Sequence, residues 1–335
     1  MGKIIKINKG LDIKLHGKAE QVISTYEPNL YAVQPSDFRV LLPRLLVQEG
    51  DYVKIGSPVI QDKNNENLLL TSPVSGFVKT IVRGEKRRLE QIVIESDKKH
   101  ESIDFGAIED KNLDRQMIVD KLLLSGLWPL IRQRPYGVIA NPQDVPDAIF
   151  ISGFDTAPLA PDTNFVMKHH SAEMFQKGIN VLKKLTSGLI HLNVNPDFSI
   201  PELFLHISGV QINQFTGPHP SGNIGVQIHH ICPLTKDDVV WYLYPQDVVN
   251  IAYLFVEGKL NLKRIIANTG SELIKPSYIE TIAGACVSDL IKDNLKQENV
   301  RIISGNVLTG KNIGKYGFLR LYDTMLTAIP EGDYY

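Results

Sequence analysis

Cysteine is scarce in this sequence, and so are long apolar runs and excess charge of either sign. The two cysteines, Cys232 and Cys286, are too few for a disulfide framework or a four-thiolate cluster, and their scarcity fits a reducing compartment. The longest apolar stretch, residues 239–256, is interrupted by a proline and three polar residues, whereas a membrane span needs about 20 mostly apolar residues. A net charge of −1 supplies no field for nucleic acid or anionic lipid.

What is present indicates a folded protein of two or three domains. The chain has 335 residues, of which 43% are hydrophobic and 22% charged, as expected for a protein that buries a core. The first ten residues are charged and lack the apolar centre of a signal peptide, so we expect a chain that is not exported. A peripheral role at a membrane stays open.

The order of patterns predicts a mixed fold of three parts, with boundaries near residues 100 and 257. Residues 1–100 alternate short apolar runs with turn signals, which is typical of a small all-β unit. Residues 101–256 alternate helix and strand patterns, which favours a Rossmann-like α/β domain with a mostly parallel sheet. Residues 257–330 read as a small α+β unit.

Individual elements can be assigned by their periodicity and caps. We expect helices at 114–124, 171–185, 245–256 and 279–291, and strands at 148–152, 189–194 and 203–207. Ser171 suits the start of the second helix, and Gly258 suits the left-handed residue after the third.

Two basic features of the β unit have alternative interpretations. Lys63 lies near a predicted hairpin tip, where biotinyl and lipoyl carrier domains bear an acylated lysine, but a solvated turn lysine explains it more simply. The run Arg83, Lys86, Arg87 and Arg88 is too small and too poor in aromatics for a nucleic-acid patch, and a solvated hairpin or a surface for an acidic partner is favoured.

The histidines do not predict a metal site. They occur as the pairs 169–170 and 229–230, with His219 in a loop, and His230 would share one face with Cys232 if that segment were a strand. A structural zinc site needs four ligands, usually in two short-spaced pairs, and no second pair is present.

A glycine-rich loop follows at residues 217–222, with Gly217, His219 and Gly222. It matches neither GxGxxG nor a P-loop, and its prolines remove backbone donors that a phosphate cradle would need. A rigid turn is the simpler interpretation, although loops at strand ends shape ligand pockets in α/β folds.

The segment 125–136 carries the most suggestive set of side chains. Trp128, Arg132, Arg134 and Tyr136 combine aromatic faces with guanidinium donors, which suit a flat aromatic ligand bearing carbonyls, such as a quinone. The alternative is a segment packed between domains, since the same residue types dominate ordinary contacts.

Several of these segments, taken in order, resemble the NqrA family, the A subunit of the sodium-translocating NADH:quinone oxidoreductase. The resemblance is carried by INKGLD at 7–12, EQVI at 20–23, TSPVSG at 71–76, SGLW at 125–128, RP at 134–135, FDTAPLA at 154–160, GPHPSG at 217–222, YPQDV at 244–248 and VRIISG at 300–305. Residues 47–78 separately resemble the barrel-sandwich hammerhead of the carrier domains. Each motif alone is weak, and their order along the chain is specific.

The resemblance implies a role in a six-subunit respiratory pump. It implies an N-terminal barrel-sandwich hybrid, a central Rossmann-like domain and a C-terminal β-grasp (SLBB-like) domain. It further implies a peripheral position on the cytoplasmic side of the bacterial inner membrane, with five partner subunits that hold the FAD, FMN, riboflavin and iron–sulfur centres. Related flavin-binding subunits have a glycine-rich loop where this chain has Leu127 and Trp128, so the resemblance implies that this subunit holds no redox cofactor or metal. Family members continue past residue 335 into a further C-terminal region.

Our leading hypothesis is therefore a non-redox subunit that docks on membrane subunits and helps to form a quinone site. The residues expected to serve it are Trp128, Arg132, Arg134 and Tyr136, with residues 31–38, including Tyr31 and Phe38, as a second wall. Two alternatives remain open: a lipoyl- or biotin-type carrier, and a protein that has kept a flavin or NADH site.

Overall fold

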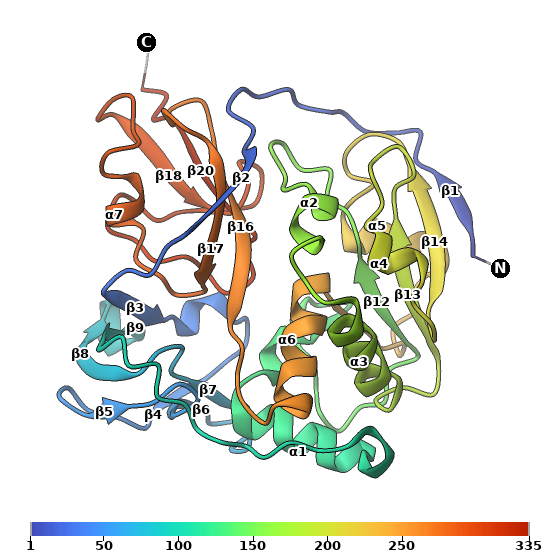
Figure 1. The fold of residues 1–335 in the computed structure, drawn as a ribbon, viewed down its shortest axis with the longest axis horizontal. Helices are drawn as coiled ribbons and strands as arrows, with labels where there is room; N and C mark the ends of the chain where they lie inside the picture. Colours follow the sequence, from blue (N-terminus) through green and yellow to red (C-terminus); the bar gives the residue numbers. More distant parts are fainter. Residues whose placement is uncertain (1, 334–335) are drawn as a thin grey trace.

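The computed structural model describes residues 2–333, with Asp110 described by its backbone only. Its largest sheet has seven strands and carries helices on both faces (Figure 1). The strands, in spatial order, are β1 (Ile4–Lys6), β14 (Gln211–Thr216), β13 (Leu189–Val194), β12 (Ala148–Ser152), β15 (Val240–Leu243), β10 (Arg132–Arg134) and β11 (Val138–Ile139). The first five are parallel, while β10 pairs antiparallel with both β15 and β11, so the prediction of a mostly parallel sheet is confirmed.

The helices of this α/β part begin and end at residues that the sequence singles out. They are α1 (Arg115–Ser125), α2 (Thr163–Met167), α3 (Ala172–Lys183), α4 (Glu202–Leu205), α5 (Ile224–Ile231) and α6 (Pro245–Val256). The Ser171 side chain accepts from the backbone N–H of Met174 and so caps α3. Gly258 takes a φ of 69° just after α6, as predicted.

The N-terminal part consists of two small antiparallel sheets. One contains β3 (Leu30–Val33), β9 (Leu89–Ser96), β8 (Gly76–Arg83) and β5 (Tyr52–Val53), and the other contains β4 (Pro43–Leu45), β6 (Pro58–Asp62) and β7 (Leu69–Thr71). Their inward side chains form one core that includes Val59, Ile60 and Ile92, which confirms an all-β unit. Two strands within the predicted range 1–100, Ile4–Lys6 and Glu20–Thr25, pair instead with the other two sheets.

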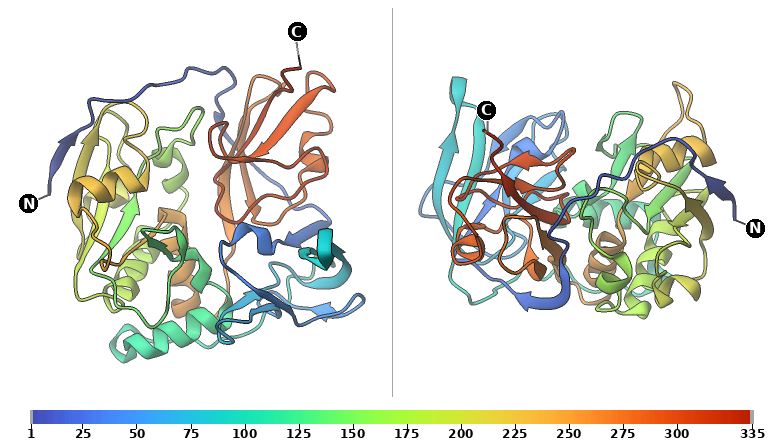
Figure 2. Two further views of the ribbon diagram at one scale, coloured as in Figure 1. Left: turned by 180° about the vertical axis from the view of Figure 1, so that it is seen from behind. Right: turned by 90° about the horizontal axis from the view of Figure 1, so that it is seen from above.

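The C-terminal part is a six-stranded sheet with one short helix. The strands are β19 (Lys311–Asn312), β18 (Val300–Ser304), β20 (Met325–Pro330), β16 (Lys263–Thr269), β17 (Ser277–Ile282) and β2 (Glu20–Thr25), and the helix is α7 (Ser288–Ile291). The N-terminal segment therefore supplies edge strands to two sheets, because β1 pairs with β14 and β2 pairs with β17. Figure 2 shows this segment running from one half of the molecule to the other.

Two local predictions were wrong. Residues 203–207 lie mostly in helix α4, which follows Pro201, since a short apolar run does not by itself distinguish strand from helix. Residues 279–291 form strand β17 and the short helix α7, because pairing with β16 and β2 overrides a helical spacing and Gly284 at φ 88° separates the two elements. His230 lies in the last turn of α5, so it shares no strand face with Cys232.

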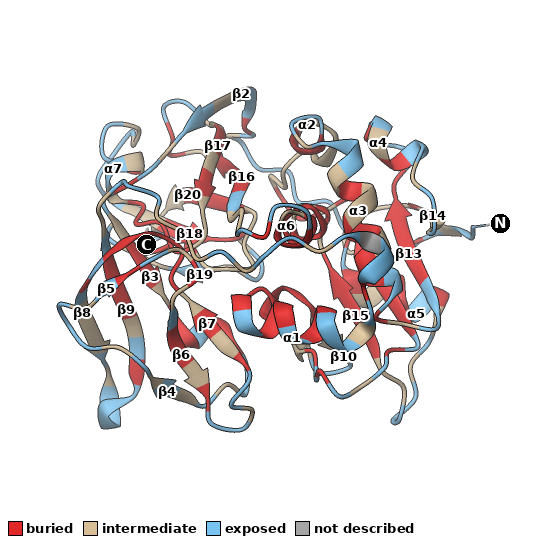
Figure 3. Ribbon diagram, turned by 60° about the horizontal axis from the view of Figure 1, so that its bottom comes forward, coloured by how far each residue is buried: buried red, intermediate tan, exposed pale blue. Residues whose placement is uncertain are grey.

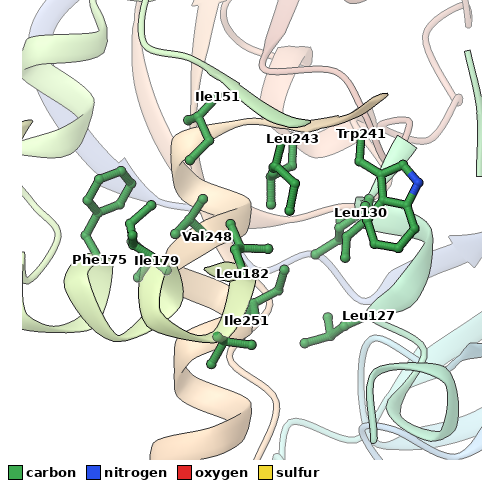
Figure 4. Packing of buried hydrophobic residues seen from close by; sticks show 14 of the residues in the cluster. Leu127, Leu130, Ile151, Phe175, Ile179, Leu182, Trp241, Leu243, Val248 and Ile251 are labelled. Atoms are coloured by element: carbon green, nitrogen blue, oxygen red, sulfur yellow. The ribbon is translucent and has the colours of Figure 1, made fainter. Parts of the chain in front are cut away.

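Alternate side chains along the strands of the seven-stranded sheet form an apolar layer on each of its two faces. Along β12, Ile149 and Ile151 face α3 and α6, while Ala148 and Phe150 face α5. Figure 3 shows α6 buried along much of its length, and Figure 4 shows side chains of α3 and α6 meeting Leu127 and Leu130. Because the same cluster continues into Leu68 and Met325, the main core extends into the other two parts.

Candidate functional site

Trp128 is a core residue and presents no face to a ligand. Its side chain is 0% exposed, its Nε1 donates to the carbonyl of Ala140 at 2.7 Å, and its ring meets Trp241 edge-on at 5.4 Å. Tyr31 is equally enclosed, at 2% exposure within the N-terminal core. The stacking role expected for these two rings is therefore inconsistent with their burial.

Arg132 lies in an aromatic cage between the α/β and C-terminal parts. Its guanidinium carbon lies 4.5 Å from the ring centroid of Tyr242, 5.3 Å from that of Tyr244 and 4.2 Å from that of Tyr322. Its Nε is buried and has no hydrogen-bond partner. Arg132 lines a cavity of about 230 Å³ that also reaches Asp247 and Asp323, and we name it the interdomain cavity.

Arg134 and Tyr136 lie in different surroundings. Arg134 is 6.0 Å from the Tyr242 ring and lies against Gly225 at the start of α5. Tyr136 is 70% exposed on the turn before β11, and its carbonyl accepts from Nη1 of Arg39 at 3.5 Å. The four residues predicted from segment 125–136 thus do not share one pocket, but the segment does meet residues 31–39.

The place where these two segments meet is a cavity of about 90 Å³, which we call the junction pocket. All three parts of the molecule contribute walls. Its lining includes Ala32, Asp37, Phe38 and Thr71, then Leu127, Pro129, Leu130 and Asn250, and finally Arg264, Ile282, Ala283 and Leu319. Of the predicted second wall, residues 32–34, Asp37 and Phe38 line this pocket, while Arg132 lines the neighbouring cavity.

A few polar groups stand in the otherwise apolar wall of the junction pocket. Oδ1 of Asn250 is buried without a hydrogen-bond partner, and so is Nε of Arg264. The guanidinium of Arg264 also lies 3.5 Å from Asp247, in the first turn of α6. Asp37 accepts from Nε of Arg320 at 2.9 Å and from the backbone N–H of Leu321 at 3.0 Å, yet burial raises the pKa of its carboxyl above the ordinary value. Buried groups without a partner, here Oδ1 of Asn250 and Nε of Arg264, are costly unless a ligand or water pairs them.

The glycine-rich loop lies elsewhere, at the carboxyl ends of β12, β13 and β14. Its chain is held by Thr156, whose hydroxyl lies 3.1 Å from Nδ1 of His219 and accepts from the backbone N–H of Gly222 at 2.9 Å. Gly217 has a φ of 112°, and a Cβ there would stand 2.1 Å from the carbonyl oxygen of Ile7. A cleft of about 900 Å³ opens beside it, lined in part by Gly217 and Asp155. No residue of the loop is among the described residues that line the junction pocket.

The remaining candidates have simple settings. Lys63 is exposed just after β6, and its backbone N–H donates to the carbonyl of Leu42, which continues the pairing of β6 with β4. The basic run forms the β8–β9 hairpin tip, where Nη1 of Arg83 donates to the carbonyl of Arg87. Within residues 2–333, no group of three or more His, Cys, Asp or Glu side chains could hold a metal ion. In the same range, no helix combines the length and apolarity needed to cross a membrane.

Each of the three parts of the chain matches a domain of a known protein family. Residues 5–97 match the NqrA N-terminal barrel-sandwich hybrid domain, 113–260 the NqrA second alpha/beta domain, and 265–315 the NQRA C-terminal domain. The chain is 37% identical over 336 residues to the A subunit of the Na(+)-translocating NADH-quinone reductase of Alcanivorax borkumensis, covering 98% of this chain and 74% of that one. It is also 37% identical to the Marinomonas sp. protein of the same name, covering 98% and 73%.

The chain belongs to the NqrA family. The predicted fold class of barrel-sandwich, α/β and C-terminal SLBB domains is confirmed with it. Among solved structures, an NAD+-reducing [NiFe]-hydrogenase in the H2-reduced state is 10% identical, with a TM-score of 0.42, over 64% of this chain and 47% of that one. That likeness is too low to carry an argument.

The sequence did not single out Asn250 and Arg264, two polar residues of the junction pocket in this NqrA chain, whereas Asp37 lies within the predicted wall 31–38. Asn250 and Arg264 belong to no motif. Asn250 interrupts the apolar stretch of α6, and this was the only available signal: a polar residue at a buried helix position needs a partner.

Proposed function

We propose that this chain serves as the peripheral, cytoplasmic-side NqrA component of a Na(+)-translocating NADH-quinone reductase, and that its junction pocket receives a quinone headgroup. The relatives are named as subunits of that enzyme, so partner subunits are expected. We propose that five of them accompany this chain and carry the flavins and the iron–sulfur centres, while this chain holds no redox cofactor of its own.

The proposal rests on one observation, the pair of unpartnered buried groups in an apolar wall. The Nε–H of Arg264 can donate to a quinone carbonyl, and Oδ1 of Asn250 can accept from the hydroxyl of the reduced form. Phe38 and Pro129 supply apolar faces for the ring. Since a cavity of about 90 Å³ is smaller than the roughly 300–1,000 Å³ of drug-sized sites, it suits the tip of a headgroup, with the tail outside.

The segment that stands in place of a flavin loop supports the same proposal. Leu127 is 2% exposed and belongs to the main core, as does Trp128. Their side chains occupy volume that a glycine-rich loop leaves to a cofactor. A quinone site without its own redox group needs electrons from partner subunits, as expected for one component of a larger reductase.

Photo-crosslinking tests the pocket. A photoreactive quinone analogue is applied to the assembled reductase, and we expect labelled peptides from residues 32–38 or 126–130. Ala283→Phe, which fills the pocket wall, is expected to remove the label, whereas Ala107→Phe on the exposed surface is its matched control. Labels confined to other subunits would refute the quinone proposal and leave the place of this chain in the reductase intact.

We further propose that the surface beside the pocket docks on a membrane subunit of the same reductase. Val40, Leu42 and Tyr136 are 74%, 51% and 70% exposed, and the contact between Arg39 and Tyr136 brings their segments together. Val40 also holds a φ of 69°, which is rare and strained for a β-branched residue. Val40→Asp is expected to reduce recovery of the partner subunits in a detergent pull-down, and Val22→Asp, on β2, serves as the control. Equal recovery from both variants would contradict this docking surface.

A further inference from the structure

Asp37 is the carboxylate that reaches both the junction pocket and a second row of polar groups. It ends the 3₁₀ turn Pro35–Asp37 at the pocket wall and is 9% exposed. Arg320 approaches it from the C-terminal part at 2.9 Å. This carboxylate is therefore held at the pocket by a residue from another domain.

Arg320 connects Asp37 to a second buried carboxylate. Its Nη1 lies 4.0 Å from Oδ2 of Asp323, and the hydroxyl of Ser304 donates to that same oxygen at 2.7 Å. The backbone N–H of Arg320 in turn donates to the hydroxyl of Ser304 at 3.0 Å. Asp323 lines the interdomain cavity, so the row Asp37–Arg320–Asp323 runs from one cavity to the other.

The interdomain cavity can hold water beside this row. Its volume of about 230 Å³ exceeds the roughly 30 Å³ share of a water molecule, and its lining includes the polar side chains of Thr309, Asp155 and Asp247. Water in such a cavity has polar partners on several sides. The junction pocket is by contrast mostly apolar, with Asp37 as its one lining carboxyl among the described residues.

The charges around Asp37 come from several elements. Arg320 and, further off, Lys311 of β19 favour its ionised form, whereas Asp323 and Asp37 disfavour each other's charge. Tyr322 packs nearby with a buried hydroxyl, and Arg264 stands in the wall of the same pocket. Burial is the largest influence and raises the pKa of both Asp37 and Asp323.

We propose that Asp37 is the proton donor to the quinone ring in the junction pocket, and that Asp323, on the far side of Arg320, is a positioning residue that shares the guanidinium with Asp37. Asp37 takes up a proton from water before each transfer, while Arg320 stays protonated throughout. This inference rests on the quinone site proposed above. Reduction of a quinone to a quinol takes two electrons and two protons. The electrons come from NADH through the partner subunits. Each time a ring oxygen gains negative charge, an O–H bond forms to it as the O–H bond of Asp37 breaks, and the remaining carboxylate is stabilised by Arg320.

The test compares turnover, quinone KM and photolabelling in the assembled reductase. Asp37→Asn is expected to lower kcat for quinone reduction at least about 100-fold, within the range of general-acid contributions, with KM and labelling of the pocket unchanged. A proton donor works only while protonated, so wild-type kcat must fall as pH rises through the pKa of Asp37. This alkaline limb should vanish in Asp37→Asn and return in Asp37→Glu, which a merely structural role would not produce.

Asp323→Asn provides a second variant that leaves the pocket wall intact. It is expected to lower kcat with labelling retained, and Asp237→Asn, at an exposed carboxylate, is expected to behave as wild type. An unchanged kcat and pH profile in Asp37→Asn or Asp323→Asn, with labelling retained, overturns these roles and leaves the quinone pocket standing. Absence of pocket labelling in the wild-type enzyme overturns the quinone pocket and these roles together.

Discussion

The buried polar residues of this protein differ in whether their polar atoms have hydrogen-bond partners. His191 on β13 is 6% exposed, stacks on Phe150 at a centroid distance of 4.7 Å, and lies 3.3 Å from Nδ2 of Asn213. Burial lowers its pKa from 6.5 to about 4, so the folded protein keeps this imidazole neutral near neutral pH. Asn250, by contrast, keeps an unpartnered oxygen. Because Asn250 also lines the junction pocket, its unpartnered oxygen is the reason that we propose a ligand there.

The shifted pKa of His191 predicts a specific loss of stability in acid. The unfolded chain binds a proton near pH 6.5 and the folded chain only near pH 4, so the free energy of unfolding falls as pH drops through this window. Since one pKa unit corresponds to 1.36 kcal/mol, the loss is at most about 3 kcal/mol. Urea unfolding at pH 7 and pH 4.5 should show a smaller loss for His191→Gln than for the wild type. His206→Gln, at an exposed histidine, should keep the full wild-type loss, and equal losses in all three proteins would contradict this account.

At the scale of helices and strands, the sequence predicted those features that depend only on neighbouring residues in the chain. Asp114 and Ser171 cap α1 and α3, because a side-chain oxygen next to free backbone N–H groups acts within one turn. The segment at 279–291 could not be assigned this way, because its strand exists through pairing with β16 and β2, which lie elsewhere in the sequence. The same holds for the site: segments 31–38 and 125–136 were identified, but Trp128 turned inward and Arg264 came from β16. Which face of an element is buried depends on its neighbours.

The contact between the N-terminal segment and Gly270 predicts a loss of stability for alanine at Gly17, with Gly50 as the control. Gly17 has a φ of 91°, and a Cβ there would stand 2.1 Å from the carbonyl oxygen of Gly270; Gly50 has a φ of 92° with nothing within 4 Å. Alanine at Gly50 should therefore cost only the backbone penalty of about 1–2 kcal/mol. Gly17→Ala should cost clearly more, because it also separates the approach to β2 from Gly270. Urea unfolding of the two variants measures the difference, and equal losses would show that this contact contributes no stability.

At the scale of the whole molecule, the three parts share walls instead of meeting through linkers. The main hydrophobic cluster includes Leu68 of the N-terminal part, Leu122 of α1 and Met325 of β20. The hydroxyl of Tyr322 donates to the carbonyl of Pro129 at 2.7 Å, beside the junction pocket. A pocket whose walls come from three domains exists only while all three are docked, so ligand binding in this pocket and domain docking should be coupled.

This shared core predicts that the chain unfolds as one unit. Both tryptophans, Trp128 and Trp241, lie in the α/β part, so their fluorescence reports that part alone, whereas far-UV circular dichroism reports all three. In urea the two signals should give the same midpoint, because losing one part exposes the apolar surface of the others. Tyr322→Phe removes the hydrogen bond to Pro129 and is expected to lower the free energy of unfolding by about 1 kcal/mol, shifting both midpoints together. Two separated transitions in the wild type would mean that the parts fold independently, and the pocket between them would then open without global unfolding.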